Sequence, residues 1–131
     1  MLLDYWLNKL SESAIGNNAP RFGVEFEHLS FSSNLTPCQI DGESGMSSLL
    51  NAMADQGAGT IVENHEGNSY ALEGSFGLVT LEPGCQLELS TPPRQSTQDI
   101  ELDLVNFRQA LLGIQDRFPL VLAGIGANPL N

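Results

Sequence analysis

Strict alternation of apolar and polar residues predicts a half-buried β-strand from Cys85 to Thr91. Successive side chains of a strand point to opposite faces, so this segment has one apolar face for a core and one polar face that can carry functional side chains. The apolar residues are Cys85, Leu87 and Leu89, and the polar residues are Gln86, Glu88 and Ser90. A solvated outer face and a functional site both fit this pattern.

A second alternating stretch, residues 22–31, predicts another strand that carries two acidic residues on one side. Glu25 and Glu27 fall on the same face, about 7 Å apart along the strand. Like charges at this spacing repel each other, and a bound divalent cation such as Mg²⁺ would turn the repulsion into ligation. A solvated face is the alternative. Leu29 and Phe31 share the face of the two carboxylates, so we expect apolar material to cover part of it.

Helical spacing of apolar residues predicts three helices, and short apolar or alternating runs predict further strands. The predicted helices cover residues 3–10, 46–53 and 96–118, and the further strands cover residues 60–63, 70–72, 76–81 and 120–125. At the start of the long helix, Ser96 and Asp99 can form a variant of the capping box, and Pro119 ends the helix. These elements predict an α+β fold in which an antiparallel sheet has helices on one face and a polar surface on the other.

The Pro83-Gly84 turn decides whether Glu82 joins the polar face. A two-residue hairpin loop would place Glu82 on the face opposite to that of Glu88. Pro followed by Gly suits a type II turn, which fits two-residue hairpins poorly. We therefore expect a bulge or a longer connection, which brings both carboxylates to one face.

The chain has 131 residues, and we interpret residues 1–131 as a single domain in which a helix and a linker, residues 1–20, precede the motif-bearing part. Five Lys and Arg residues against sixteen Asp and Glu residues give a formal net charge of −11. This charge argues against nucleic acid and anionic membranes as partners, and it is compatible with cation binding or with solubility alone. The sequence has no signal-peptide pattern and no window typical of a membrane span, so we expect a cytoplasmic protein.

The two cysteines, Cys38 and Cys85, have neither a metal-ligand spacing nor the pattern of a disulfide framework, which favours a reducing compartment. Strand parity places Cys85 on the apolar face, where burial raises the pKa of a thiol, so we expect Cys85 to be unreactive. A disulfide between the two requires the loop of residues 32–45 to fold back, and the sequence gives no reason to expect this.

Three segments carry motifs that support one another through their order and spacing. They are Phe22-Gly23-Val24-Glu25-Phe26-Glu27, residues 79–90 with the run L-E-P-G-C-Q-L-E-L-S, and residues 124–129 with G-I-G-A-N-P. Together they resemble the start of a glutamate–cysteine ligase of the plant and proteobacterial type, in the carboxylate–amine ligase group related to glutamine synthetase. The resemblance covers nearly all of the chain from Arg21 onward. Where that family usually has a second glycine after the turn, this chain has Cys85.

The resemblance implies part of a glutamine synthetase-like catalytic fold and an ATP-dependent ligase that joins L-glutamate to L-cysteine in the first step of glutathione biosynthesis. ATP would phosphorylate the glutamate side chain, and the cysteine amine would displace the phosphate. The metal-ligand candidates that the resemblance implies for Mg²⁺ are Glu25, Glu27, Glu82 and Glu88. Gln86 and Asn128 are the implied polar neighbours of nucleotide or substrate, and none of these residues would act as a nucleophile.

Basic residues that would clamp phosphate groups are scarce in this chain. They are Lys9, Arg21, Arg94, Arg108 and Arg117. Enzymes of the family are several-fold longer, so we expect an N-terminal fragment whose open sheet edge pairs with the downstream part of the polypeptide or with another chain. The alternatives are another carboxylate–amine ligase of the same group, with a different amine acceptor, and a non-catalytic acidic domain that binds a metal or a partner.

Overall fold

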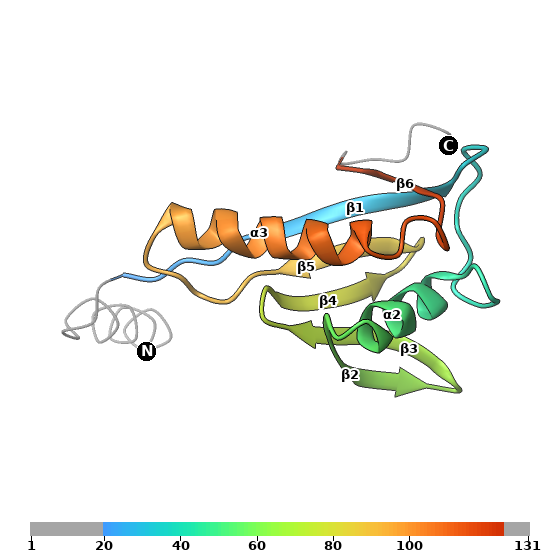
Figure 1. Ribbon diagram of the computed structural model, residues 1–131, viewed down its shortest axis with the longest axis horizontal. Coiled ribbons are helices and arrows are strands. Elements are labelled where there is room, and N and C mark those ends of the chain that lie inside the picture. The colour runs from blue at the N-terminus through green and yellow to red at the C-terminus, as the bar shows by residue number, and fades with distance from the viewer. Residues whose placement is uncertain (1–19, 125–131) are drawn as a thin grey trace, which may run out of the picture.

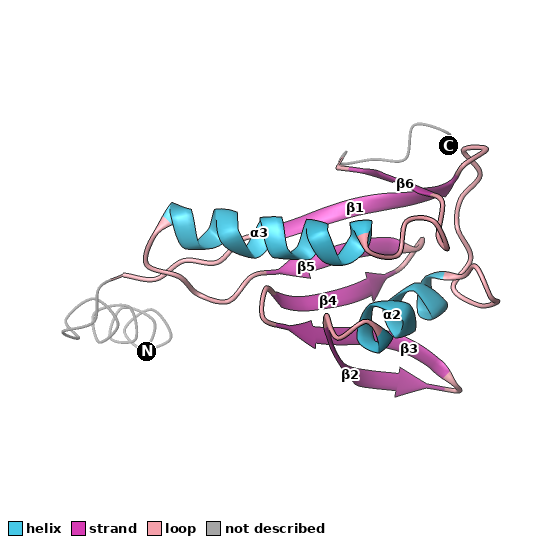
Figure 2. Cartoon of the chain, viewed as in Figure 1, coloured by secondary structure: helices cyan, strands magenta, loops and turns pink. Residues whose placement is uncertain are grey.

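The computed structural model describes residues 20–124, which form a six-stranded sheet with two helices packed on one of its faces (Figures 1 and 2). The elements are β1 (Glu25–Ser32), α2 (Met46–Asp55), β2 (Gly59–His65), β3 (Asn68–Gly74), β4 (Gly77–Glu82), β5 (Gln86–Ser90), α3 (Thr97–Leu112) and β6 (Leu120–Ala123). The strand order is β2-β3-β4-β5-β1-β6, and each neighbouring pair is antiparallel. The predicted α+β fold is confirmed, whereas the helix predicted at residues 3–10 lies outside the described residues.

The hydrophobic core lies between the sheet and the two helices. Its fully buried members are Met46, Leu49, Leu50 and Met53 of α2 and Leu72, Val79, Leu87 and Leu89 of the strands. Burial of side chains of this size contributes about 1.5–3 kcal/mol each. From α3, the Phe107 ring packs edge-on against Phe76, with 5.6 Å between ring centroids. Neither helix is long and apolar enough to cross a membrane within the described part of the chain.

The N-terminus of α3 is capped by the side chain of Ser96. The Ser96 hydroxyl accepts the backbone N–H of Asp99 at 3.2 Å and donates to the Asp99 carboxylate at 2.7 Å. The hydroxyl thus satisfies one of the free N–H groups of the first turn, and a negative charge lies near the positive end of the helix dipole. The predicted variant of the capping box is confirmed.

The predicted extension of the long helix to Phe118 is wrong, because α3 ends at Leu112 with Gly113 as its C-cap. Glycine has a low helix propensity, since it loses the most backbone freedom on folding. Beyond it, the N–H groups of Ile114 and Gln115 bond to carbonyl oxygens three residues back, which is a tighter turn than that of an α-helix. Ile114 and Phe118 are still buried, so the apolar stripe that suggested a longer helix continues through irregular turns.

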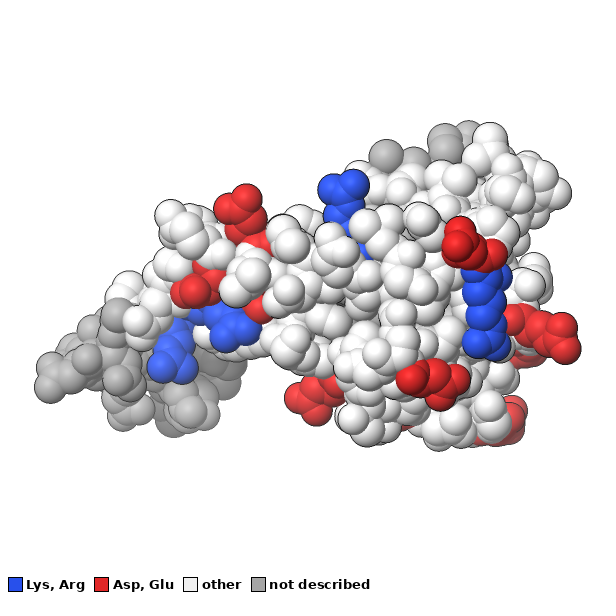
Figure 3. Space-filling model, viewed as in Figure 1, with Lys and Arg blue, Asp and Glu red and all other residues white. Residues whose placement is uncertain are grey.

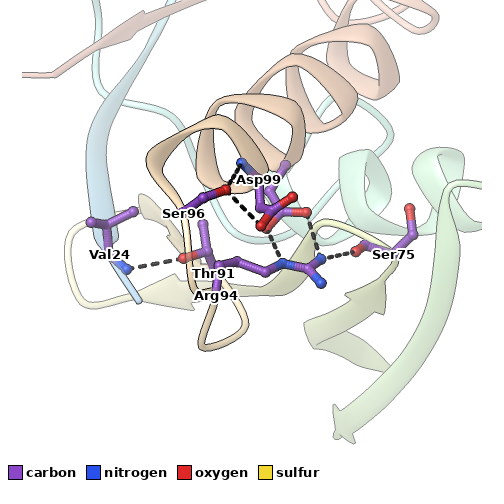
Figure 4. A network of polar contacts seen from close by, with 7 residues as sticks. Val24, Ser75, Thr91, Arg94, Ser96 and Asp99 are labelled. Atoms are coloured by element: carbon purple, nitrogen blue, oxygen red, sulfur yellow. Dashed lines mark hydrogen bonds and ion pairs between the residues drawn. The ribbon is translucent and has the colours of Figure 1, made fainter. Parts of the chain in front are cut away.

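A polar network holds the start of β1 against the segment between β5 and α3 (Figure 4). Arg94 makes two charge-assisted hydrogen bonds to the buried carboxylate of Asp103, at 2.8 and 2.7 Å, and also donates to the Ser75 carbonyl at 3.4 Å. The hydroxyl of Thr91 accepts the backbone N–H of Val24 at 2.9 Å. The Thr91 contact fixes the start of β1 beside the end of β5, on which the placement of the acidic residues depends, and the Arg94 contacts anchor the following segment to α3 and to Ser75.

Two glycines flank the two-residue β3–β4 turn and allow a close approach of backbone segments. A Cβ on Gly74 would lie 2.6 Å from the carbonyl oxygen of Ala58, and a Cβ on Gly77 would collide with the carbonyl oxygen of Ser90. Gly77 also has a φ of 127°, a conformation that glycine adopts readily and other residues do not. The β4–β5 pairing beside Ser90 therefore requires glycine at position 77.

We expect Gly77→Ala to lower the free energy of unfolding by about 2–5 kcal/mol, because backbone strain and a steric clash add together. The matched control is Gly67→Ala. Gly67 also has a positive φ, 86°, but nothing lies within 4 Å of a Cβ built on it, so only the strain of about 1–2 kcal/mol is expected. Urea unfolding of the two variants measures the difference. Equal destabilisation would contradict the close approach at Gly77.

Candidate functional site

The four candidate metal ligands lie on the face of the sheet turned away from α2 and α3. In the β1–β5 register Glu27 stands directly opposite Glu88 and Glu25 opposite Ser90, while Glu82 of β4 stands opposite Gln86. Residues directly opposite in antiparallel strands share a face. Leu87 and Leu89 point into the core, so their polar neighbours in β5 and the opposing glutamates point the other way.

The β4–β5 turn has three residues, Pro83 to Cys85, between the paired residues Glu82 and Gln86. Gly84 and Cys85 have φ angles of 79° and 59°. This connection is longer than a two-residue hairpin loop, as expected, and it places Glu82 on the face of Glu88.

Glu27 and Glu88 form the central pair of this face. Side chains directly opposite across two strands have Cβ atoms about 4.5–5.5 Å apart, a distance at which like charges destabilise the sheet. The hydroxyl of Ser90 donates to Oε1 of Glu88 at 3.1 Å and so orients that carboxylate. Thr80, which stands opposite Glu88 on β4, has a buried Oγ1 with no hydrogen-bond partner in residues 20–124.

Two further carboxylates on this face, Glu63 of β2 and Glu73 of β3, were not predicted from the sequence. Across β2, β3 and β4, Glu63 is opposite Ala71, and Ala71 is opposite Thr80. Across β3, β4 and β5, Glu73 is opposite Leu78, and Leu78 is opposite Ser90. The position of these two glutamates beside the other carboxylates follows from the strand order. The alternation of side chains within a single strand does not give that order. We call the set Glu25, Glu27, Glu63, Glu73, Glu82 and Glu88 the acidic face.

Cationic side chains do not balance the acidic face within the described sheet, because none of its six strands contains Lys or Arg. Figure 3 shows the opposite, helix-bearing side, where acidic and basic side chains are scattered over a largely uncharged surface. Arg94 is already paired with Asp103. The charge of the acidic face is therefore left to ions or ligands from solution, or to other parts of the polypeptide.

Convergence of the four predicted glutamates on one ion stays a prediction. In residues 20–124, no group of three or more His, Cys, Asp or Glu side chains is arranged so that it could hold a metal ion. The register brings together Glu27 and Glu88 as direct partners, and Glu25 and Glu82 flank them on neighbouring positions of the same face. Gln86 lies on this face as well, with Nε2 3.4 Å from the Pro83 carbonyl oxygen. Asn128 lies outside the described residues.

Cys85 is buried, at 7% exposure, and belongs to the core cluster, which confirms its predicted location. Burial raises the pKa of its thiol, and the negative charge of Asp41 adds to the effect. The φ of 59° places Cys85 in the left-handed region, where side chains other than those of Gly, Asn and Asp are disfavoured. The second glycine of the family motif would fit this position without strain, which is a physical reason for glycine there.

The model of glutamate-cysteine ligase family 2 (GCS2) matches residues 21–131, and the chain belongs to this family. The match begins at the residue from which the sequence motifs resemble such ligases. No curated protein gives a significant match to the chain. Family membership supports a function of the glutamate–cysteine ligase type in general terms, within glutathione biosynthesis, and the six-stranded antiparallel sheet with its two helices is compatible with a ligase fold.

Replacing one carboxylate of the central pair should stabilise the metal-free protein. We expect Glu27→Gln to raise the free energy of unfolding by about 0.2–1 kcal/mol at low ionic strength, because the repulsion with Glu88 is removed. Glu43→Gln, at an exposed loop position outside the strands, removes the same charge and should have little effect. Urea unfolding without divalent cations measures both, and equal effects would show that only net charge matters.

The conformation of Cys85 gives a second prediction. Cys85→Gly relieves the left-handed strain, whereas Cys85→Ala keeps it, and both substitutions remove the buried sulfur. We therefore expect the glycine variant to be more stable than the alanine variant by about 1 kcal/mol. Thermal or urea unfolding of the two variants tests this order, and a more stable alanine variant would contradict it.

Proposed function

We propose that the acidic face is the Mg²⁺-binding part of an ATP-dependent glutamate–cysteine ligase. The observation that carries the proposal is the direct opposition of Glu27 and Glu88 on neighbouring strands, away from the helices. An arrangement that costs stability in the metal-free protein is reasonable where a cation offsets the repulsion. Family membership supports ligase chemistry, and the proposal adds the cation, the nucleotide and the residues.

The donor set fits Mg²⁺ in its chemistry. Mg²⁺ prefers carboxylate oxygens, and it is usually held by one or two carboxylates together with water and substrate phosphates. Glu27 and Glu88 would be the principal ligands, with Glu25 and Glu82 beside them. When bound, the cation would neutralise charge on the phosphate oxygens of ATP.

The other polar groups of the face would position these ligands and the substrates. Ser90 holds the Glu88 carboxylate through the 3.1 Å hydrogen bond. The side-chain amide of Gln86 has both a donor and an acceptor, so it can bind a phosphate or a carboxylate oxygen next to Glu82. Thr80 offers a hydroxyl beside Glu88. None of these groups needs to be a nucleophile, because the amine of L-cysteine attacks the activated carboxyl of L-glutamate.

Basic groups must come from outside the described sheet. Stabilising the charge of a transferring phosphoryl group requires Lys or Arg side chains in addition to metal ions, and the six strands contain none. We therefore propose that the chain is the N-terminal part of a longer ligase and that the isolated chain does not turn over. The β6 edge, whose four residues pair with the second half of β1, is where further strands would be added.

A non-catalytic acidic module is the alternative that a specific observation favours. The lack of cationic side chains in the described strands suits a domain that binds a metal ion or a basic partner without handling phosphates. Another carboxylate–amine ligase of the same group would share the acidic face and differ in its acceptor amine.

The experiment compares the 131-residue chain with the longer polypeptide that the same reading frame encodes beyond Asn131. Phosphate release and γ-glutamylcysteine formation are measured with ATP, Mg²⁺, L-glutamate and L-cysteine. We expect turnover by the longer polypeptide alone. In it, Glu27→Gln and Glu88→Gln should each lower kcat/KM at least about a hundredfold, since each removes transition-state charge stabilisation, whereas Glu43→Gln should not.

Each contrary outcome identifies a different error. Turnover by the short chain would disprove the fragment interpretation. Equal activity of the Glu27→Gln and Glu43→Gln variants would disprove the role of the acidic face. Use of another amine in place of L-cysteine would indicate a related ligase. Mg²⁺ binding without turnover in both polypeptides would favour the non-catalytic module.

A further inference from the structure

The loop between β1 and α2 folds back along the edge of β1, a return for which the sequence provides no reason. The backbone N–H of Ser32 donates to the Thr36 carbonyl at 2.9 Å, and that of Cys38 donates to the Ser30 carbonyl at 3.2 Å. Phe31 and Pro37 form an isolated β-bridge between these bonds. Cys38 therefore stands opposite Ser30 on this edge of β1.

Strand β5 lies along the same edge of β1. Its pairing with β1 begins next to the place where the pairing of the returning loop ends. The β1–β5 register ends with Leu29 opposite Gln86, so Cys85, the residue before Gln86, comes next to the position at which Cys38 stands opposite Ser30. The opposite edge of β1 at this point is occupied by β6, with Ser30 opposite Leu122. Gln86 and Cys38 thus stand opposite consecutive residues of β1, and Cys85 lies where the two segments meet. Figure 1 shows the β4–β5 turn and the loop after β1 at one end of the sheet.

Both cysteines also face the core. Cys85 belongs to the buried cluster, and Cys38 is half-buried and packs against that cluster. A disulfide requires neighbouring positions and a shared face, because its Cα atoms are separated by only about 4.4–6.8 Å. We propose that Cys38 and Cys85 are a redox-active thiol pair that oxidises to an intramolecular disulfide joining the loop after β1 to the β4–β5 turn.

Access from solvent differs between the two thiols and sets their order of reaction. Cys38 lines a cavity of about 310 Å³ between the returning loop and residues 118–120, with Asp41 and Ser44 also in its wall. Cys85 is buried and does not line that cavity. Cys38 is therefore the thiol that a small reagent meets first, and Cys85 is the thiol that resolves the product.

The oxidant is a low-molecular-weight disulfide, and the exchange balances without another reactant. The Cys38 thiolate attacks one sulfur of the reagent, the reagent's S–S bond breaks, and one small thiol leaves. The Cys85 thiolate then attacks the Cys38 sulfur of the mixed disulfide, and the second small thiol leaves. Two protein thiols are oxidised, one small disulfide is reduced to two thiols, and the protons of the protein thiols pass to the departing thiolates.

The electrostatic setting makes this exchange slow near neutral pH. Burial raises the pKa of both thiols, and the charge of Cys85 adds to the effect at Cys38, as that of Asp41 does at Cys85. The thiolate is the attacking species, so the rate should rise as pH increases toward these raised pKa values. Oxidation of the pair near neutral pH should therefore require a sustained excess of the small disulfide.

The test uses the 131-residue chain and bis(2-hydroxyethyl) disulfide, an uncharged reagent that the net charge of −11 does not repel. Cleavage after glutamate separates the two cysteines, since Glu43, Glu63 and Glu73 lie between them. We expect loss of both free thiols and a Cys38–Cys85 linked peptide pair under non-reducing conditions. The effective concentration of the pair should be at least about tenfold higher in the folded chain than in urea, where only loop closure brings the thiols together.

Two single variants establish the order of reaction. Cys85→Ala should stop at a stable mixed disulfide on Cys38, and Cys38→Ser should leave Cys85 as a free thiol over the same period. Amide hydrogen exchange at residues 84–86 should become slower in the oxidised wild-type chain, because the turn is then held from a second side. This readout does not depend on ligase activity, so it separates the disulfide from the proposed function.

Three results would overturn the proposal. They are a persistent mixed disulfide on Cys38 of the wild-type chain, disulfide-linked dimers in place of the intramolecular product, and equal effective concentrations in the folded and unfolded chains.

Discussion

The antiparallel pairing of β1 with β5 is the contact on which both the core and the acidic face depend. One register places Phe26 beside Leu89 on the helix side and Glu27 beside Glu88 on the other side. A slip of one residue would exchange the two faces, burying the carboxylates and exposing the leucines. The free energy of burying Leu87 and Leu89 therefore maintains the electrostatic repulsion on the opposite surface. Packing on one side of the sheet holds together charges that would separate if they were free.

Several other features serve to keep that register. Arg94 and Asp103 anchor the segment after β5 to α3, and the Thr91 hydroxyl holds the backbone just before β1. Gly77 lets β4 approach the carbonyl of Ser90 at the end of β5. Because these contacts surround the end of β5 farthest from the β4–β5 turn, the strand is fixed there by side chains and at its start by the turn. The carboxylates between the two ends have little freedom to change partners.

Strand parity explains why much of this arrangement could be predicted from the sequence. Alternation in β1 and β5 assigned Glu25, Glu27 and Glu88 to one face, and the Pro-Gly geometry placed Glu82 with them. The features missed depend on contacts between distant segments or on a single residue. Glu73 joins the face only through the order of β3 and β4, the return of the loop at Cys38 depends on hydrogen bonds to β1, and α3 stops at Gly113 although the apolar stripe continues.

The absence of Lys and Arg from the six described strands affects how the acidic face responds to its ionic medium. At physiological ionic strength the Debye length is about 8 Å, longer than the roughly 5 Å between opposed side chains of neighbouring strands. Diffuse monovalent salt therefore screens Glu27 from the more distant carboxylates of the sheet but only weakly from Glu88. A site-bound ion can relieve the repulsion of this closest pair where a diffuse ion atmosphere cannot. The stability of the acidic face therefore depends more on a cation bound at Glu27 and Glu88 than on the concentration of diffuse monovalent ions.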